Sequence, residues 1–321
     1  MREGIVLRAV SGVYTVQING RTIQCTLRGN LKKEFQYTTS ASHARRVIRA
    51  KRPYTHDTVS VGDRVRIVET GRDMGVIEEV LPRRSRLVRA GFRGREQTIV
   101  CNLDQLVIVF ACAAPNPDVW KLDRFLIAAE AEGLEPLIVA NKRDLVPVSE
   151  WRRPFVEFEA IGYRVLPTSA KMGEGIEALR DALREKVSAF VGPSGVGKSS
   201  LLNVIQPGLR LRTGDIGHVT YKGRHVTTAT QLIPLHSGGW VADTPGLRQL
   251  ELLELDRDEL AACFVEFKPY LGECRFPNCR HEVEPGCALQ AAVDKGEISP
   301  RRFQSFLQLA AEMESRESRP R

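Results

Sequence analysis

Residues 190–200 read FVGPSGVGKSS and fit the pattern G-x-x-x-x-G-K-[ST] of a phosphate-binding loop. The loop follows an apolar segment that predicts a strand, and a helix is expected to begin near Lys198. Its glycines allow backbone N–H groups to curl around phosphate oxygens at the positive end of this helix. Because such a loop needs a strand, a turn and a helix in direct succession, it predicts an α/β domain that binds a nucleotide.

Two segments supply candidate phosphate and magnesium ligands. Lys198 is expected to reach the β and γ phosphates, which makes it a candidate catalytic residue, and Ser199 is expected to bind Mg²⁺. Farther along the chain, VADTPG (241–246) ends another apolar segment. There Asp243 is placed to hold Mg²⁺ through water, and Gly246 can offer its N–H to a γ phosphate. The candidate residues of the loop itself are Gly192, Pro193, Ser194, Gly195, Val196, Gly197, Lys198, Ser199 and Ser200.

Strands alternate with helices from about residue 100 onward. The segments at 104–112 and 135–140 are continuous apolar runs, as expected for strands that are covered on both faces. Residues 117–133 have helical spacing and end at a glycine. Residues 174–187 are predicted to form a helix that leads directly into the strand before the phosphate loop. This alternation predicts a parallel sheet with right-handed crossovers.

The N-terminal region has a different pattern. Five short alternating segments predict a small β-barrel, of which the OB-fold is one common type. The segment SHARRVIRAKRP (42–53) lies between the third and fourth of them and is either a solvated, mobile loop or an arm that contacts phosphates. PRRSRLVRAGFRGREQ (82–97) is predicted to be a linker. The five segments are residues 4–10, 13–18, 22–27, 63–69 and 75–81.

Charge and hydropathy limit the partners of this chain. The formal net charge of +8 favours a polyanionic partner, most plausibly a nucleic acid. The longest uninterrupted apolar run, Leu106–Ala114, is nine residues long and too short to cross a bilayer. The N-terminus lacks the long apolar stretch of a secretory signal. We therefore expect a cytoplasmic protein that does not bind a membrane.

Three of the seven cysteines cluster near the C-terminus together with a histidine. The spacing Cys274-x₄-Cys279-x-His281-x₅-Cys287 offers three thiolates and one imidazole within fourteen residues. This set fits one closed, tetrahedral, structural zinc site, and the alternative is free buried cysteines beside an unrelated histidine. Because the segment is expected to have little core of its own, zinc is expected to hold it together.

Two further segments resemble the base-binding elements of GTPases. NKRD (141–144) resembles their N-K-x-D motif, and TSAK (168–171) resembles their second base-contacting loop. The resemblance implies that the Asp144 carboxylate accepts hydrogen bonds from guanine N1 and N2, and that the Lys142 stem covers the base. It also implies that the backbone N–H of Ala170 contacts guanine O6. The implied base-binding residues are Asn141, Lys142, Asp144, Ser169, Ala170 and Lys171.

The order of these motifs is reversed relative to an ordinary G domain, in which the phosphate loop comes first. Each motif follows its own strand, and ligands bind at the carboxyl ends of the strands in a parallel sheet. All the motifs can therefore meet at one edge whatever their order along the chain. The order predicts a circularly permuted GTPase domain. Because the termini of a compact domain often lie close together, such a permutation is sterically easy.

The permuted order, the N-terminal barrel and the C-terminal cysteine cluster together resemble the RsgA (YjeQ) family of bacterial GTPases of small-ribosomal-subunit assembly. The resemblance implies an OB-fold domain at 1–82, a circularly permuted P-loop GTPase domain at 83–250 and a helical zinc-binding domain at 251–321. It also implies GTP hydrolysis that the 30S subunit stimulates, contact with 16S rRNA, and a role late in 30S maturation. We expect a monomer. The alternative is a nucleotide-gated RNA-binding module with incidental turnover.

The residues that carry out hydrolysis are less evident. Leu247 occupies the position of the glutamine that orients water in Ras-like proteins, so intrinsic turnover is expected to be slow. The segment YKGRHVTTAT (221–230) contains Thr227 and Thr228, one of which is expected to complete the Mg²⁺ coordination; we assign Thr228. Family members carry a G-R-H-T-T-T run here, which implies that His225 is catalytic. Val226 replaces the first threonine of that run.

Overall fold

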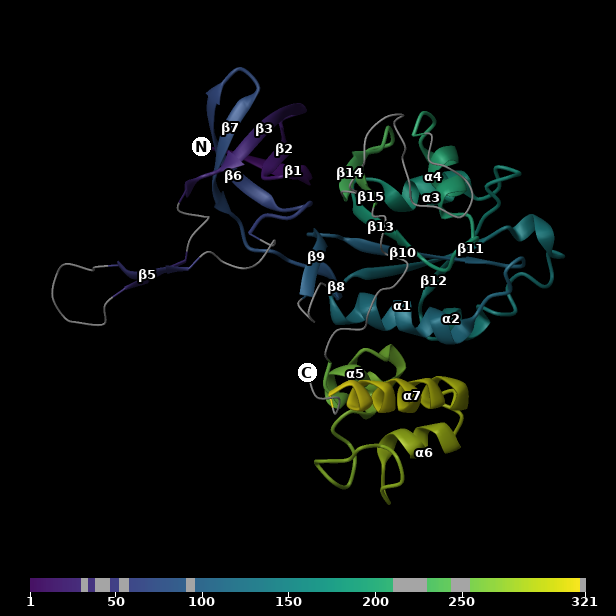
Figure 1. Ribbon diagram of the computed structural model, residues 1–321. Coiled ribbons are helices and arrows are strands. Elements are labelled where there is room, and N and C mark those ends of the chain that lie inside the picture. Colours follow the sequence, from purple (N-terminus) through teal and green to yellow (C-terminus); the bar gives the residue numbers. More distant parts are fainter. Residues whose placement is uncertain are drawn as a thin grey trace. The chain divides into compact units, whose positions relative to one another are not determined.

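The computed structural model describes residues 1–29, 34–37, 47–51, 58–90, 96–209, 230–243 and 255–317 (Figure 1). The chain divides into two compact units. The first comprises Met1–Asp104, Leu183–Ala189 and Ile216–Gln249, and the second comprises Gln105–Ala182, Phe190–Asp215 and Leu250–Arg321. No helix in these described ranges combines the length and the apolar character needed to traverse a bilayer.

The N-terminal strands form a closed five-stranded barrel. Strand β1 pairs with β2, β2 with β3, and β3 with β7 in parallel. Strand β7 then pairs with β6, and β6 pairs with β1, which closes the barrel. Inward-facing apolar side chains such as Val16, Ile23 and Ile67 fill the interior. The prediction of a small barrel is therefore confirmed. The strands are β1 (Arg2–Val10), β2 (Val13–Ile18), β3 (Arg21–Leu27), β6 (Arg64–Gly71) and β7 (Met74–Val80).

Two hairpins occupy segments that the sequence pattern left irregular. Strands β4 (Glu34–Tyr37) and β5 (Val47–Lys51) pair within the region of the basic segment. Strands β8 (Arg86–Ala90) and β9 (Glu96–Cys101) also pair, so the prediction that 82–97 is merely a linker is wrong. The strand pattern was hidden because arginines dominate this segment and a bulge between Leu87 and Val88 interrupts the alternation.

The second unit contains a parallel sheet in which β11 pairs with both β10 and β12. Strand β10 is buried along its whole length, as its apolar run predicts. Asp118 begins α1 by accepting a hydrogen bond from the backbone N–H of Lys121. The elements are β10 (Gln105–Ala111), α1 (Val119–Ala131), β11 (Glu135–Asn141), η3 (Arg143–Leu145), α2 (Val156–Ala160), β12 (Arg164–Pro167), α3 (Ile176–Leu183) and α4 (Lys198–Ile205).

Strands β13 (Val187–Val191) and β15 (Trp240–Asp243) pair in parallel, as predicted for the strands before the two phosphate motifs. An additional strand, β14 (Gln231–Pro234), pairs antiparallel with β15 and with β1 of the barrel. The sheet is therefore mixed rather than purely parallel. The predicted helix at 174–187 is too long, because α3 ends at Leu183 and the left-handed backbone of Glu185 (φ 59°) turns the chain into β13.

The C-terminal region is helical, with α5 (Arg257–Ala262), η4 (Val265–Tyr270), α6 (Ala288–Asp294) and α7 (Pro300–Glu317). Its core contains stacked Phe264 and Phe267, with Phe306 edge-on to both. Ile127 and Ala128 of α1 belong to the same buried cluster. The apolar faces of these helices pack on one another and on α1, so the helices around the cysteine segment have a core of their own.

A buried charge cluster joins α7 to α1. Arg302 is fully buried. Its guanidinium donates hydrogen bonds of 2.6 Å to Asp123 of α1 and to Glu266. The guanidinium carbon also lies 4.5 Å from the centroid of the Phe264 ring. Arg301 donates to the other oxygen of Asp123, also at 2.6 Å. Since Asp123 is itself inaccessible to solvent, this one carboxylate fastens the C-terminal helices to the nucleotide-binding sheet.

Replacing Asp123 by alanine should strongly destabilise the chain. The substitution leaves the buried Arg302 without one of its carboxylates, and breaking such a pair costs about 3–5 kcal/mol. Glu312→Ala is the matched control, because it removes the partner of Arg124 in a pair whose side chains are 48% and 34% exposed. That loss should cost no more than about 1 kcal/mol. Chemical denaturation measures both, and equal losses would contradict the assigned role of Asp123.

Candidate nucleotide-binding site and metal centre

The phosphate-loop sequence adopts backbone conformations that only glycine tolerates at two of its positions. Gly192 has φ +134°, and a Cβ atom there would lie 2.1 Å from the carbonyl oxygen of Val109 in β10. Gly197 has φ +97°, and its Cβ atom would lie 2.4 Å from the side-chain nitrogen of Asn141. The loop therefore packs directly against β10 and against the end of β11, which leaves no room for a side chain at these positions.

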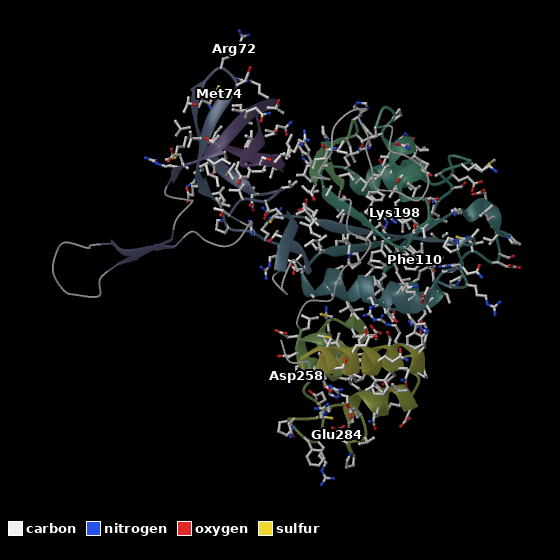
Figure 2. All side chains as sticks on the ribbon, in the orientation of Figure 1. Arg72, Met74, Phe110, Lys198, Asp258 and Glu284 are labelled. Carbon is white, nitrogen blue, oxygen red and sulfur yellow. The ribbon has the colours of Figure 1, made fainter. Side chains whose placement is uncertain are left out.

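Lys198 begins α4, and Figure 2 labels its position in the nucleotide-binding region. Its ammonium donates hydrogen bonds of 2.7 Å to the carbonyl oxygens of both Gly192 and Pro193. The positive charge therefore lies beside the N-terminus of α4, where backbone N–H groups and the helix dipole already favour an anion. Ser199 and Ser200 follow in the first turn of this helix.

The far end of α4 is held by the helix that precedes the loop in the chain. Arg180 of α3 donates to the carbonyl oxygens of Val204 and Ile205 at 2.8 and 3.3 Å. These are the last carbonyl groups of α4, which have no partners within the helix. Arg180 therefore fixes the position of the phosphate helix relative to α3.

Asn141, the last residue of β11, joins three of the predicted motifs. Its buried side chain donates to the carbonyl oxygen of Val196 in the phosphate loop at 2.8 Å. Its side-chain oxygen accepts hydrogen bonds from the Thr168 hydroxyl at 3.2 Å and from the backbone N–H of Ala170 at 3.3 Å. One amide thus holds the phosphate loop, the NKRD segment and the TSAK segment together.

The base-binding candidates lie on the two loops that Asn141 connects. The Asp144 carboxylate accepts a hydrogen bond of 2.6 Å from the Ser169 hydroxyl, which in turn accepts from the backbone N–H of Met172. Lys142 has a left-handed backbone, with φ 58°, and its ammonium donates to the carbonyl oxygen of Ala114. Lys171 is exposed on the second loop.

Several predicted residues cannot be placed in this site. Asp243 is the last residue of β15, where its backbone pairs with Gln231 of β14. The other predicted residues, namely His225, Thr227, Thr228, Gly246 and Leu247, lie outside the described part of the chain. Their roles remain predictions.

Three residues of the base-binding loops were missed by the motif analysis. Thr168 binds Asn141, and Arg143 donates from Nε to a carboxylate oxygen of Glu174 at 2.7 Å. Thr168 stands inside the quoted TSAK segment and Arg143 inside NKRD, so their positions were available from the motifs. Nothing in the local sequence marks Glu174, because its pairing depends on how the two loops meet.

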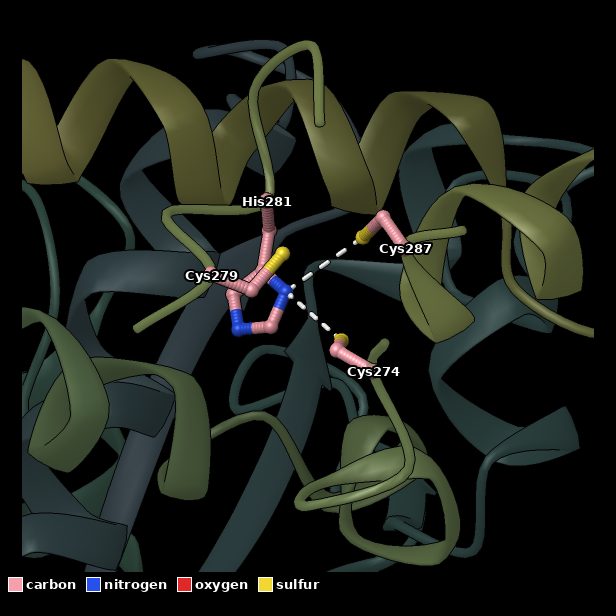
Figure 3. A group of neighbouring side chains, drawn as sticks. All are labelled: Cys274, Cys279, His281 and Cys287. Atoms are coloured by element: carbon pink, nitrogen blue, oxygen red, sulfur yellow. Dashed lines mark hydrogen bonds between the residues drawn. The ribbon is translucent and has the colours of Figure 1, made fainter. Parts of the chain in front are cut away.

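The cysteine cluster assembles as its spacing predicts. Ligand atoms of Cys274, Cys279, His281 and Cys287 all lie within 4.8 Å of one another (Figure 3). Nδ1 of His281 is 3.5 Å from the Cys274 sulfur and 3.4 Å from the Cys287 sulfur. A tetrahedral zinc ion, with bonds of about 2.0–2.3 Å, separates its ligand atoms by roughly 3.5–3.8 Å, so the donor set and spacing fit such an ion.

The electrostatics of the cluster favour a bound cation. Burial lowers the pKa of His281, which keeps the imidazole neutral and able to donate a lone pair to a metal. Burial raises the pKa of Cys279 to about 12 and also raises the pKa of Cys287. Thiolates at these positions therefore need a nearby positive charge, which a divalent metal ion supplies. We assign the four residues as a metal-binding centre.

Comparisons with known proteins agree with this architecture. Residues 3–77 match the family model described as RsgA N-terminal domain, and residues 80–253 match the model described as RsgA GTPase. A relative from Gemmatimonas aurantiaca, named small ribosomal subunit biogenesis GTPase RsgA, is 42% identical over 318 residues, covering 98% of both chains. A relative of the same name from Moorella thermoacetica is 42% identical over 316 residues, again covering 98% of both.

Two solved structures are similar over nearly the whole chain. The crystal structure of YjeQ from Thermotoga maritima has a TM-score of 0.77 and 34% sequence identity, with 99% of each chain covered. The structure of YloQ, described as a circularly permuted GTPase, has a TM-score of 0.74 and 30% identity, with 100% of this chain and 97% of that chain covered. Because similarity at this level spans the barrel, the reordered nucleotide motifs and the cysteine cluster, the chain belongs to the RsgA family of circularly permuted GTPases.

Proposed function

We propose that this chain hydrolyses GTP to GDP and phosphate on the small (30S) ribosomal subunit, which stimulates the reaction, and that it acts late in 30S maturation. The observation that carries the proposal is the set of hydrogen bonds from Asn141, which gather the phosphate loop and both base loops into one nucleotide site. The relatives named small ribosomal subunit biogenesis GTPase RsgA match it along their full lengths and support the choice of partner.

In the proposed complex the nucleotide lies across the loops that Asn141 connects. Asp144 accepts hydrogen bonds from the guanine edge, the Lys142 stem covers the base, and the Ala170 N–H contacts O6, with Ser169 and Lys171 beside them. The phosphates lie in the loop 192–200 against the N-terminus of α4. A carboxylate that faces guanine discriminates strongly against adenine, which lacks the matching donors.

The proposed catalytic groups act on the developing negative charge and on the attacking water. Lys198 stabilises the β and γ phosphates, and Mg²⁺ is held by Ser199, Thr228 and Asp243. His225 orients the water, because Leu247 has no hydrogen-bonding group for that task. Because Leu247 replaces the glutamine that orients water in Ras-like proteins, we expect fast turnover to depend on the ribosomal partner.

The proposed partner surface includes exposed arginines of the barrel. The chain as a whole carries a net charge of +8. Arg8 and Arg72 are exposed, with Arg72 in the turn between β6 and β7 (Figure 2), whereas the exposed Arg21 and Arg64 also pair with Asp73 and Glu3. Such side chains suit the phosphate backbone of 16S rRNA. Because the proposed partner is the ribosome, we place the protein in the cytoplasm. We propose that it acts there as a monomer and does not bind a membrane.

The second candidate is a nucleotide-gated RNA-binding module whose turnover is incidental, and the apolar Leu247 favours it.

Multiple-turnover GTP hydrolysis, measured with and without 30S subunits, separates the two candidate functions. A GTPase that works on the subunit should gain at least about tenfold in kcat when 30S is added, because the partner completes the catalytic group. ATP should not be hydrolysed under the same conditions. A rate that 30S leaves unchanged would favour the binding module.

His225→Ala should lower the 30S-stimulated kcat by about 100-fold, which is typical of removing a group that positions or activates water. The GDP dissociation constant should stay unchanged, because the role proposed for His225 is to orient the attacking water and not to bind the base or the phosphates. His236→Ala is the matched control, since it removes another histidine of the same chain. Stimulated turnover equal to wild type would exclude His225 from catalysis.

We propose that the metal of the cysteine cluster is one structural Zn²⁺ ion. The donor set of three thiolates and one imidazole prefers zinc, and the four protein ligands leave no coordination position for a substrate. The ion would supply the charge that the buried thiolates need. It would fasten the segment 274–287, while the phenylalanine core of α5, η4 and α7 holds the surrounding helices to α1.

Zinc removal should therefore loosen only a part of the C-terminal region. With a chelator, hydrogen exchange should accelerate across 274–287 while α1 and α4 keep their protection. Cys279→Ser should lose bound zinc by elemental analysis, and Cys263→Ala should retain it, because Cys263 is a buried cysteine outside the cluster. Full zinc content in Cys279→Ser would contradict the assignment.

A further inference from the structure

Arg143 and Glu174 form an ion pair between the two base loops that the proposed mechanism does not use. The distance from Arg143 Nε to the Glu174 carboxylate is 2.7 Å, and the side chains are 22% and 42% exposed. Arg143 stands between the two base-binding candidates of the NKRD segment, and Glu174 lies beyond the TSAK segment at the start of the turn into α3. The pair therefore spans the two loops that flank the guanine position.

Together with the other hydrogen bonds, this pair closes a ring of four residues. Arg143 is bonded through the chain to Asp144, whose carboxylate accepts from the Ser169 hydroxyl at 2.6 Å. The backbone N–H of Ser169 donates to the carbonyl oxygen of Glu174 at 3.0 Å. The Glu174 side chain then returns to Arg143. The ring limits how far the two loops can move relative to each other, and it thereby keeps the Ser169 hydroxyl in place against the Asp144 carboxylate.

The backbone on either side of the ring is also restricted. Lys142 holds a left-handed conformation immediately before Arg143. Gly175 follows Glu174 with φ +69°, and a Cβ atom there would lie 2.1 Å from the Pro167 carbonyl oxygen. Close packing of this glycine on the end of β12 places the Glu174 side chain within reach of Arg143. The backbone of both loops thus brings the two side chains of this partly exposed pair together.

We propose that Arg143 and Glu174 are positioning residues that set guanine selectivity by fixing the plane of the Asp144 carboxylate. The inference rests on the proposed function, because it requires Asp144 to bind the guanine edge. Two parallel hydrogen bonds, to N1–H and to the N2 amino group, require the carboxylate to lie in the plane of the base. A tilted carboxylate keeps one of these bonds and loses the other. Selectivity for the N2 amino group is therefore the property that the ring controls.

The test compares GDP with inosine diphosphate, which keeps N1–H and lacks the N2 amino group. In the full-length protein, Glu174→Ala opens the ring and should weaken GDP binding by about fivefold to tenfold, a change typical of one lost hydrogen bond. Inosine diphosphate binding should change by less than about twofold, because its complex never had the second bond. Glu174→Gln keeps an acceptor oxygen for Arg143 and should recover most of the GDP preference.

Arg143→Met opens the same ring from the other side and should lower the ratio of the two affinities equally. Glu159→Ala is the matched control, because it removes the carboxylate partner of Arg152 from a surface pair in α2 and should leave both affinities unchanged. Equal weakening of both nucleotides, or a ratio within twofold of wild type in Glu174→Ala and Arg143→Met, would overturn the inference. Wild-type protein that fails to prefer GDP over ADP would instead overturn the proposed function.

Discussion

The side-chain amide of Asn141 is the contact on which the nucleotide site depends. It is buried and donates to the phosphate loop, while it accepts from the Thr168 hydroxyl and the Ala170 N–H of the TSAK segment. A side-chain amide is suited to this task, because its NH₂ group donates and its oxygen accepts hydrogen bonds. It can therefore bind a segment that offers a carbonyl oxygen and a segment that offers N–H or O–H donors at the same time. An apolar replacement would leave the Val196 carbonyl oxygen, the Thr168 hydroxyl and the Ala170 N–H without this partner inside the domain.

That contact also explains why a reordered chain can build the same kind of site. In the second unit, β10, β11 and β12 run parallel, so the segments that follow them emerge at one edge of the sheet. Asn141 and the phosphate loop meet there although 55 positions separate Asn141 from Val196. The permutation changes which covalent links join the strands, and α3 now leads through a short turn into β13. Strand β11 still lies between β10 and β12 in the sheet.

The C-terminal helices are part of this same unit and not an independent appendage. Asp123 of α1 holds two arginines of α7, and α1 contributes to the phenylalanine-rich core. A movement of the metal-binding region relative to the sheet must therefore carry α1 along or break the buried Asp123–Arg302 pair. Breaking the pair is unfavourable, because it leaves the buried Arg302 without one of its two carboxylate partners.

The sequence by itself determined the three-part organisation, the five barrel strands, the α/β alternation and the cysteine spacing. Each of these depends on residues close together in the chain, where hydrophobic period, turn residues and ligand spacing are visible. Tertiary structure alone decided the β8–β9 hairpin, the antiparallel β14, the Arg143–Glu174 pair and the docking of α7. The reason is physical: Arg302 meets Asp123 across 179 positions, and a charged residue that becomes buried looks locally like any surface arginine until its partners are in place.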